Sequence, residues 1–160
     1  MAGYEASERP LSDEKYRKIA EFRYRIRQFL YFSEEAARAL GIEPQQHQLL
    51  LAIKGLPKGT RPTITAVSSR LCLRHNSTVE LANRLVAQGA IARRHSEEDA
   101  REVLLELTPF GEQILRALSV LHWQQLQNSG PALAASLRAI VKHTTRRSRS
   151  RAPATINNEP

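Results

Sequence analysis

Short polar side chains and clustered arginines are the residues of this chain whose types and spacing suggest a chemical role. At about 100° per residue, one helical face of residues 76–87 carries side chains that would pack inward, namely Thr78, Leu81, Ala82 and Leu85. The opposite face is polar and nearly uncharged, and comprises Asn76, Glu80, Asn83 and Ala87, flanked by Ser77, Val79 and Arg84. Asparagine pairs with adenine, glutamate accepts from cytosine and valine contacts a thymine methyl, so this face suits the major groove of duplex DNA. The alternative is an ordinary solvated helix face.

A second candidate group lies in residues 91–107, where two short runs with strand character flank a polar tip. The apolar residues of the second run alternate, as in a half-buried strand. The candidate DNA-binding residues of this hairpin are Arg93, Arg94, His95, Asp99 and Arg101. Arginines on such a projection enter a minor groove or clamp phosphates, and we expect Asp99 to pair with the guanidinium of Arg101. The alternative is a mobile charged loop.

Two short helices must position these groups. The pattern predicts a short helix capped by Thr65, then a tight link at Arg74–His75, and a further helix that begins near Ser77. Ser77 and Glu80 have the spacing of a capping box. Two helices joined by a tight turn and followed at once by a hairpin form a winged helix-turn-helix. Arg74 and His75, at its turn, join the candidate DNA-binding set.

Helical patterns flank this motif on both sides. Apolar residues recur every three or four positions from Asp13 to Leu40, which predicts a helix of about 27 residues. A second helix follows Pro44, a third opens at Pro109, and we expect a break at Gly130-Pro131 before a last helix. A first helix that is long and rich in aromatic residues is typical of a surface that packs against another subunit.

The predicted fold is therefore mainly α with a small β-hairpin wing: a winged helix-turn-helix plus a helical dimerisation region. We divide the chain into a flexible tail (1–12), N-terminal dimerisation and connecting helices (13–60), the winged helix-turn-helix (61–108), C-terminal dimerisation helices (109–143) and a disordered basic tail (144–160).

The overall charge favours a polyanionic partner. The formal net charge is +8, and this total includes four arginines of the tail, namely Arg146, Arg147, Arg149 and Arg151. No apolar run approaches the about 20 residues of a membrane span, and no secretory signal opens the chain. We expect a soluble, cytoplasmic protein with no membrane partner.

Residues that would support catalysis or metal binding do not form a pattern. The five histidines are scattered without metal-ligand spacing, and the single cysteine, Cys72, excludes an internal disulfide and a multi-cysteine zinc site. No Ser/His/Asp set, phosphate-binding glycine loop or carboxylate pair is present. We therefore predict that the chain is not an enzyme and needs no cofactor or metal. For Cys72 we favour a packed or half-buried thiol over a redox sensor.

Several of these segments resemble the MarR family of bacterial transcription regulators, over roughly residues 14–128. The segments that carry the resemblance are 41–51, 71–81 and 83–89, followed by Asp99-Ala100-Arg101 and Leu107-Thr108-Pro109-Phe110-Gly111. Cys72 departs from the family pattern, since its turn position is often a glycine. Val79 and Glu80 place unusual chemistry at base-facing positions.

The resemblance implies a function that the residues alone do not give. It implies a homodimer built from the first helix and the last two, which binds a pseudo-palindromic operator in duplex DNA. Residues 76–83 would read the major groove, while Arg94 or a neighbour, together with Arg101, would serve the wing. Members are usually repressors released by a small ligand or an oxidant, and here we expect a small aromatic ligand. Five aromatic residues are candidates for its pocket, although we favour core or dimer packing for them: Tyr24, Phe29, Tyr31, Phe32 and Trp123. The alternative is a non-regulatory, architectural winged-helix protein that binds nucleic acid.

Overall fold

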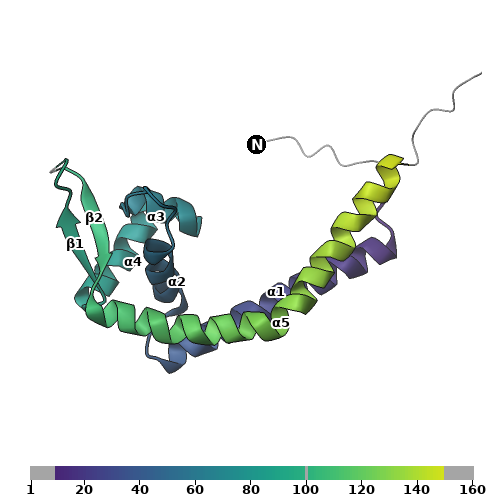
Figure 1. The fold of residues 1–160 in the computed structure, drawn as a ribbon, viewed down its shortest axis with the longest axis horizontal. Helices are drawn as coiled ribbons and strands as arrows, with labels where there is room; N and C mark the ends of the chain where they lie inside the picture. Colours follow the sequence, from purple (N-terminus) through teal and green to yellow (C-terminus); the bar gives the residue numbers. More distant parts are fainter. Residues whose placement is uncertain (1–9, 100, 150–160) are drawn as a thin grey trace, which may run out of the picture. The chain divides into compact units, whose positions relative to one another are not determined.

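The computed structural model describes residues 10–99 and 101–149, with side chains up to residue 141 (Figure 1). Its elements are α1 (Asp13–Ala39), α2 (Pro44–Lys54), α3 (Ile64–Leu71), α4 (His75–Ala87), β1 (Ile91–His95), β2 (Val103–Leu107) and α5 (Pro109–Arg149). This is the mainly helical fold with a hairpin wing that the sequence predicts. Two compact units make up the chain: a core unit, residues 31–124, and a terminal unit that contains the described residues 10–30 and 125–149.

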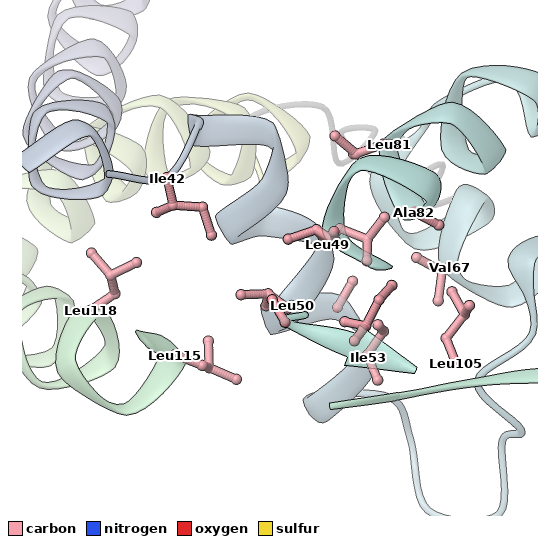
Figure 2. Packing of buried hydrophobic residues seen from close by; sticks show 14 of the residues in the cluster. Ile42, Leu49, Leu50, Ile53, Val67, Leu81, Ala82, Leu105, Leu115 and Leu118 are labelled. Atoms are coloured by element: carbon pink, nitrogen blue, oxygen red, sulfur yellow. The ribbon is translucent and has the colours of Figure 1, made fainter. Parts of the chain in front are cut away.

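A cluster of buried hydrophobic side chains holds the core unit together (Figure 2). Helix α2 lies at its centre and packs on α3, α4 and β2. Leu49 and Leu50 of α2 are fully buried, as is Leu105 of β2. Burying each such side chain contributes about 1.5–3 kcal/mol. The helix-turn-helix and the hairpin are therefore attached to one scaffold helix.

The turn between α3 and α4 differs in detail from the prediction. Thr63, not Thr65, caps α3, and its hydroxyl oxygen accepts from the backbone N–H of Ala66 at 3.2 Å. Helix α4 begins at His75 and its N-cap, Arg74, makes no side-chain cap bond, so the predicted capping box at Ser77 is wrong. Helix α4 begins earlier than predicted because the left-handed backbone at Cys72, which ends α3, reverses the chain within a few residues.

Cys72 is the residue that makes this reversal. It ends α3 with φ 54°, a left-handed conformation that glycine adopts more easily, which gives a reason for the glycine usually found there. Its thiol is exposed, so the expectation of a packed or half-buried thiol was wrong. A side chain at a left-handed helix end stands away from the helix, and here no core lies over it.

The hairpin forms in the predicted place and projects from the core unit (Figure 1). β1 and β2 are antiparallel, with Ile91 opposite Leu107 and His95 opposite Val103. The backbone N–H of Leu105 also donates to the carbonyl of Pro62 at 2.8 Å. The base of the wing is therefore tied to the segment that leads into α3.

The segment that opens α5 packs directly on the turn between α4 and β1. The Thr108 hydroxyl donates to the Gly89 carbonyl at 2.6 Å and accepts from the Gly111 N–H at 3.1 Å. A Cβ at Gly111 would lie 1.9 Å from the Ala90 carbonyl oxygen, so no larger residue fits without a backbone shift. Thr108 and Gly111 thus fix where the wing ends and α5 begins.

The predicted break at Gly130-Pro131 does not occur, and the two expected C-terminal helices are one. Helix α5 continues through Pro131 to Arg149, so the first six residues of the predicted tail, 144–149, are helical. Pro131 costs one backbone hydrogen bond, but the alanines and leucines that follow favour helix. The rest of that tail, the first nine residues and Ala100 lie outside the described residues.

Two further observations concern the described part of the chain as a whole. None of its helices is long and apolar enough to cross a membrane. Nor do three or more histidine, cysteine, aspartate or glutamate side chains of that part gather closely enough to hold a metal ion.

Helices α2 and α5 meet at two polar contacts within the core unit. At the surface, Lys54 donates to the carboxylate of Glu112 at 2.6 Å and lowers the pKa of that group. Deeper, the His47 ring lies 4.7 Å from the His122 ring. His47 is 2% exposed, and among the described residues neither of its ring nitrogens has a hydrogen-bond partner. Burial, and to a lesser extent His122, lowers the pKa of His47 to about 4.

This buried histidine predicts acid sensitivity. In the unfolded chain the pKa of His47 returns to its ordinary value of 6.5, so between pH 6.5 and 4 the unfolded chain binds a proton that the folded protein does not. The free energy of unfolding is therefore unaffected by His47 above pH 6.5, and falls by up to about 3 kcal/mol as the pH is lowered from 6.5 towards 4. Urea unfolding between pH 7 and 4 should show this loss, and His47→Leu should reduce it. Exposed His75→Leu serves as the control. An unchanged pH slope in His47→Leu would contradict this role.

Candidate nucleic-acid interface

The rotation of α4 is the one that the helical wheel predicts. Its buried residues are the four expected inner ones, Thr78, Leu81, Ala82 and Leu85. The outward residues that the sequence nominated are exposed, except for half-buried Val79, and comprise Asn76, Ser77, Val79, Glu80 and Asn83. We call these five side chains the reading face of α4, after the role that the sequence predicts for them. Because they are short, the helix backbone can approach a groove closely.

The remaining candidate residues, Arg74, His75 and Arg84, lie at the two ends of α4. Arg74 and His75 are exposed at the N-terminus, where no side chain caps the helix. Free N–H groups at such an end attract phosphate. Arg84 instead lines a groove of about 360 Å³ with Glu34 and Arg38 of α1. It therefore flanks the reading face on the side of α1 and α2.

Strand alternation sends the two arginines of β1 in opposite directions. Arg93 pairs in register with Leu105, which is fully buried, so Arg93 lies on the side of the hairpin that faces the helices. Its guanidinium donates to the side-chain oxygen of Asn83 at 2.7 Å. Arg94 lies on the other side, 3.3 Å from the carboxylate of Glu106. The hairpin and the reading face thus share a direct contact through Arg93.

The wing tip is held by its own side chains. Asp99 accepts from the backbone N–H of Arg101 at 2.9 Å, a contact to the backbone rather than the predicted pairing with the guanidinium. Because Asp99 lies only two residues before Arg101, its carboxylate reaches the backbone N–H of Arg101 more easily than the distant guanidinium. Ser96 is buried and its hydroxyl oxygen accepts from the N–H groups of Glu98 and Asp99. His95 and Arg101 are exposed on either side of this tip.

Arg61 is a contributor that the sequence did not reveal. It lies in the connection before α3, and its guanidinium donates to Glu102 at 2.7 Å and also to Glu98. This contact gives Glu98 and Glu102, two of the acidic residues of the wing, a cationic partner. No local signal could have shown it, since the partners are 37 and 41 residues away in sequence.

Removing Arg61 should loosen the wing tip without unfolding the core unit. In Arg61→Ala, amide hydrogen exchange over residues 96–102 should rise by up to about tenfold, because two exposed ion pairs are lost. Global stability should change by less than about 1 kcal/mol. Lys58→Ala, an exposed cation in the same connection, is the matched control. Equal tip exchange in both variants would show that Arg61 does not hold the wing.

Solved structures with the same fold are numerous, and 146 chains match. AbsC, a MarR family transcriptional regulator from Streptomyces coelicolor, is 16% identical, with 89% of this chain and 99% of that chain covered and a TM-score of 0.68. A mutant of S. aureus MepR bound to an oligodeoxyribonucleotide is 18% identical, with 84% and 96% covered and a TM-score of 0.57. BpsR of Bordetella bronchiseptica, whose DNA binding is regulated by 6-hydroxynicotinic acid, is 17% identical, with 77% and 94% covered and a TM-score of 0.57. No curated protein sequence matches.

The helix-turn-helix with its hairpin defines a winged-helix protein with the fold of bacterial transcription regulators. Residues 40–102, which span α2 to the wing tip, match the model of the MarR family. The match with the MarR family is therefore local, and over the rest of the chain the solved structures show that the fold is shared. Members of this family are transcription regulators, so the match agrees with the prediction that the chain is not an enzyme.

Proposed function

We propose that this chain is a dimeric, sequence-specific DNA-binding transcription regulator of the cytoplasm, which represses its target and is released by a small aromatic ligand. The observation that carries the proposal is the reading face of α4, exposed and polar, with the arginines of the wing beside it. The MepR complex with an oligodeoxyribonucleotide supports DNA as the partner. Regulation of BpsR by 6-hydroxynicotinic acid supports an aromatic effector.

Affinity and specificity would come from different residues. The reading face carries one formal charge, that of Glu80, so it adds little attraction for phosphates. The net charge of +8 and the exposed arginines around the face would supply most of the binding free energy. Asn76, Ser77, Val79 and Asn83 would supply contacts with base edges and methyl groups.

The terminal unit supports a dimer. None of the described residues at 10–30 or 125–141 belongs to the buried hydrophobic cluster. Large apolar side chains of this unit are instead exposed, among them Tyr16, Ile19, Tyr24, Leu30, Leu126, Leu137 and Val141. So much exposed apolar surface on two helices is typical of an interface. A two-fold dimer places its two recognition helices about 34 Å apart, which suits a pseudo-palindromic operator.

Three of the five candidate aromatic residues belong to the core unit: one packs against a histidine ring, and the other two are exposed. Phe32 packs edge-on against His122, with ring centroids 6.1 Å apart. Tyr31 and Trp123 are 68% and 67% exposed, so they are not core residues. Their exposure leaves them free to contact a second subunit or an aromatic effector.

DNA binding with sequence preference is the first expected result. Duplexes from the DNA that flanks the gene should bind with at least about 10³-fold preference over random duplex. The logarithm of the binding constant should fall linearly with the logarithm of salt concentration. Aromatic acids, beginning with 6-hydroxynicotinic acid, should release the preferred duplex. Fluorescence anisotropy with unlabelled competitor measures all three.

A pair of variants makes the DNA test specific to the reading face. Asn76→Ala should weaken the preferred duplex by at least about fivefold, while Gln48→Ala, an equally exposed amide on α2, should leave it unchanged. Equal affinity for every duplex would favour the architectural alternative. Absence of binding to any duplex at low salt would overturn the proposal.

The dimer can be tested on α5. Leu137 is 45% exposed and shares a helical face with Leu126 and Val141, so Leu137→Asp should shift the protein towards monomer in sedimentation velocity. Ala135 is exposed about 180° away on the same helix, and Ala135→Asp should remain dimeric. A monomeric parent protein at micromolar concentration would refute the dimer.

A further inference from the structure

The contact between Arg93 and Asn83 fixes the chemistry that the reading face presents. A guanidinium has only N–H donors, so the Asn83 atom that faces it must be the carbonyl oxygen. The amide group therefore points its oxygen towards β1 and its NH2 group away from it. The contact is not accidental in this fold, because the register with buried Leu105 places Arg93 on this side of the hairpin.

This orientation conflicts with the usual way in which asparagine reads adenine. That pairing needs the side-chain oxygen to accept from adenine N6 while the NH2 group donates to N7. The Asn83 oxygen is already engaged by Arg93 at 2.7 Å. What the pair offers outward is the NH2 group of Asn83 and the remaining N–H groups of Arg93, for which the described residues provide no other acceptor. Every group that it offers is a donor.

We propose that Arg93 and Asn83 act as one donor-only reading unit that selects a guanine in each half of the operator and rejects adenine. The inference rests on the proposed function, since it names what the reading face recognises. Guanine presents two neighbouring acceptors in the major groove, N7 and O6, which match two donors. Adenine presents a donor next to its N7, and cytosine presents a donor alone. Asn83 is the residue that touches the base, and Arg93 is a positioning residue that sets its orientation.

Selection from a randomised duplex library, followed by sequencing, measures the base preference at each position. The parent protein should select guanine at one symmetry-related pair of positions. Asn83→Asp keeps an acceptor for Arg93 but lacks the NH2 donors, so the guanine preference there should fall by about tenfold. Arg93→Ala frees the Asn83 oxygen, and the preference at the same position should turn towards adenine. Arg93→Lys, which retains a charged donor, should still select guanine.

Arg94→Ala is the matched control, because it removes the same charge one residue along the strand, on the opposite side of the hairpin. It should weaken all sequences alike and leave the base preference unchanged. All three substituted residues, Asn83, Arg93 and Arg94, are exposed, and melting curves verify that each variant is folded.

Two results would overturn the inference alone. One is a selected operator in which Arg93→Ala keeps the base preference of the parent protein, which would assign Arg93 to a phosphate contact. The other is a parent preference for adenine, or for no base, at the position that Asn83→Asp affects. If the parent protein selects no sequence at any position, the proposed function fails as well.

Discussion

The burial of the inner face of α4 against α2 determines which residues this protein can present to a partner. Ala82 and Leu85 are fully buried and Leu81 is 2% exposed. Consecutive residues of a helix differ by about 100°, so a shift of one residue would bury Asn83 or expose Leu85. Burying an unpaired amide costs about 1–3 kcal/mol, and exposing a leucine costs about as much. Hydrophobic packing, rather than any polar contact, therefore sets the reading face.

Hydrophobic burial also determines which hairpin side chains face the helices, because alternate residues of a strand point to opposite sides. Leu105 must be buried, so its partner Arg93 must face the helices and Arg94 must face away. The isolated bridge between Thr63 and Leu104 and the bond from Leu105 to Pro62 hold β2 against the segment before α3. A polar contact between wing and recognition helix thus follows from an apolar contact on the neighbouring strand.

Elements with a periodic apolar pattern are the part of the fold that the sequence predicts well. The inner face of α4, the hairpin and the long helix α1 all repeat a pattern over many residues, and such patterns average out local exceptions. The start of α4 could not be predicted in the same way. Ser77 and Glu80 satisfy the spacing of a capping box, but the left-handed backbone at Cys72 decides where the helix begins. At Pro131, the local cost of proline was smaller than the tendency of its neighbours to continue the helix.

Some features of the candidate site depend on residues close in sequence and can be predicted, whereas others depend on residues far apart in sequence. Residue types on the reading face follow from a helical wheel, but their orientation does not. The donor to Asn83 lies ten residues along the chain, on another element. The cation that the wing acids hold is about four times further away. Contacts of this kind depend on the tertiary fold, so sequence alone suggested adenine for Asn83 and did not reveal the cation that pairs with the wing acids.

These contacts change how the arginines of the wing, and Arg61 beside it, should be understood. Arg61 is engaged by Glu98 and Glu102, Arg94 by Glu106 and Arg93 by Asn83, so these three cations are held in place before any partner arrives. Ordering a long side chain on binding costs about 0.5–1.5 kcal/mol, and part of that cost is removed here in advance. The carboxylates also neutralise the charges of Arg61 and Arg94, and neutralised cations attract polyanions less strongly at long range. The wing therefore gives up some long-range attraction for a defined geometry, which the proposed discrimination between operators would use.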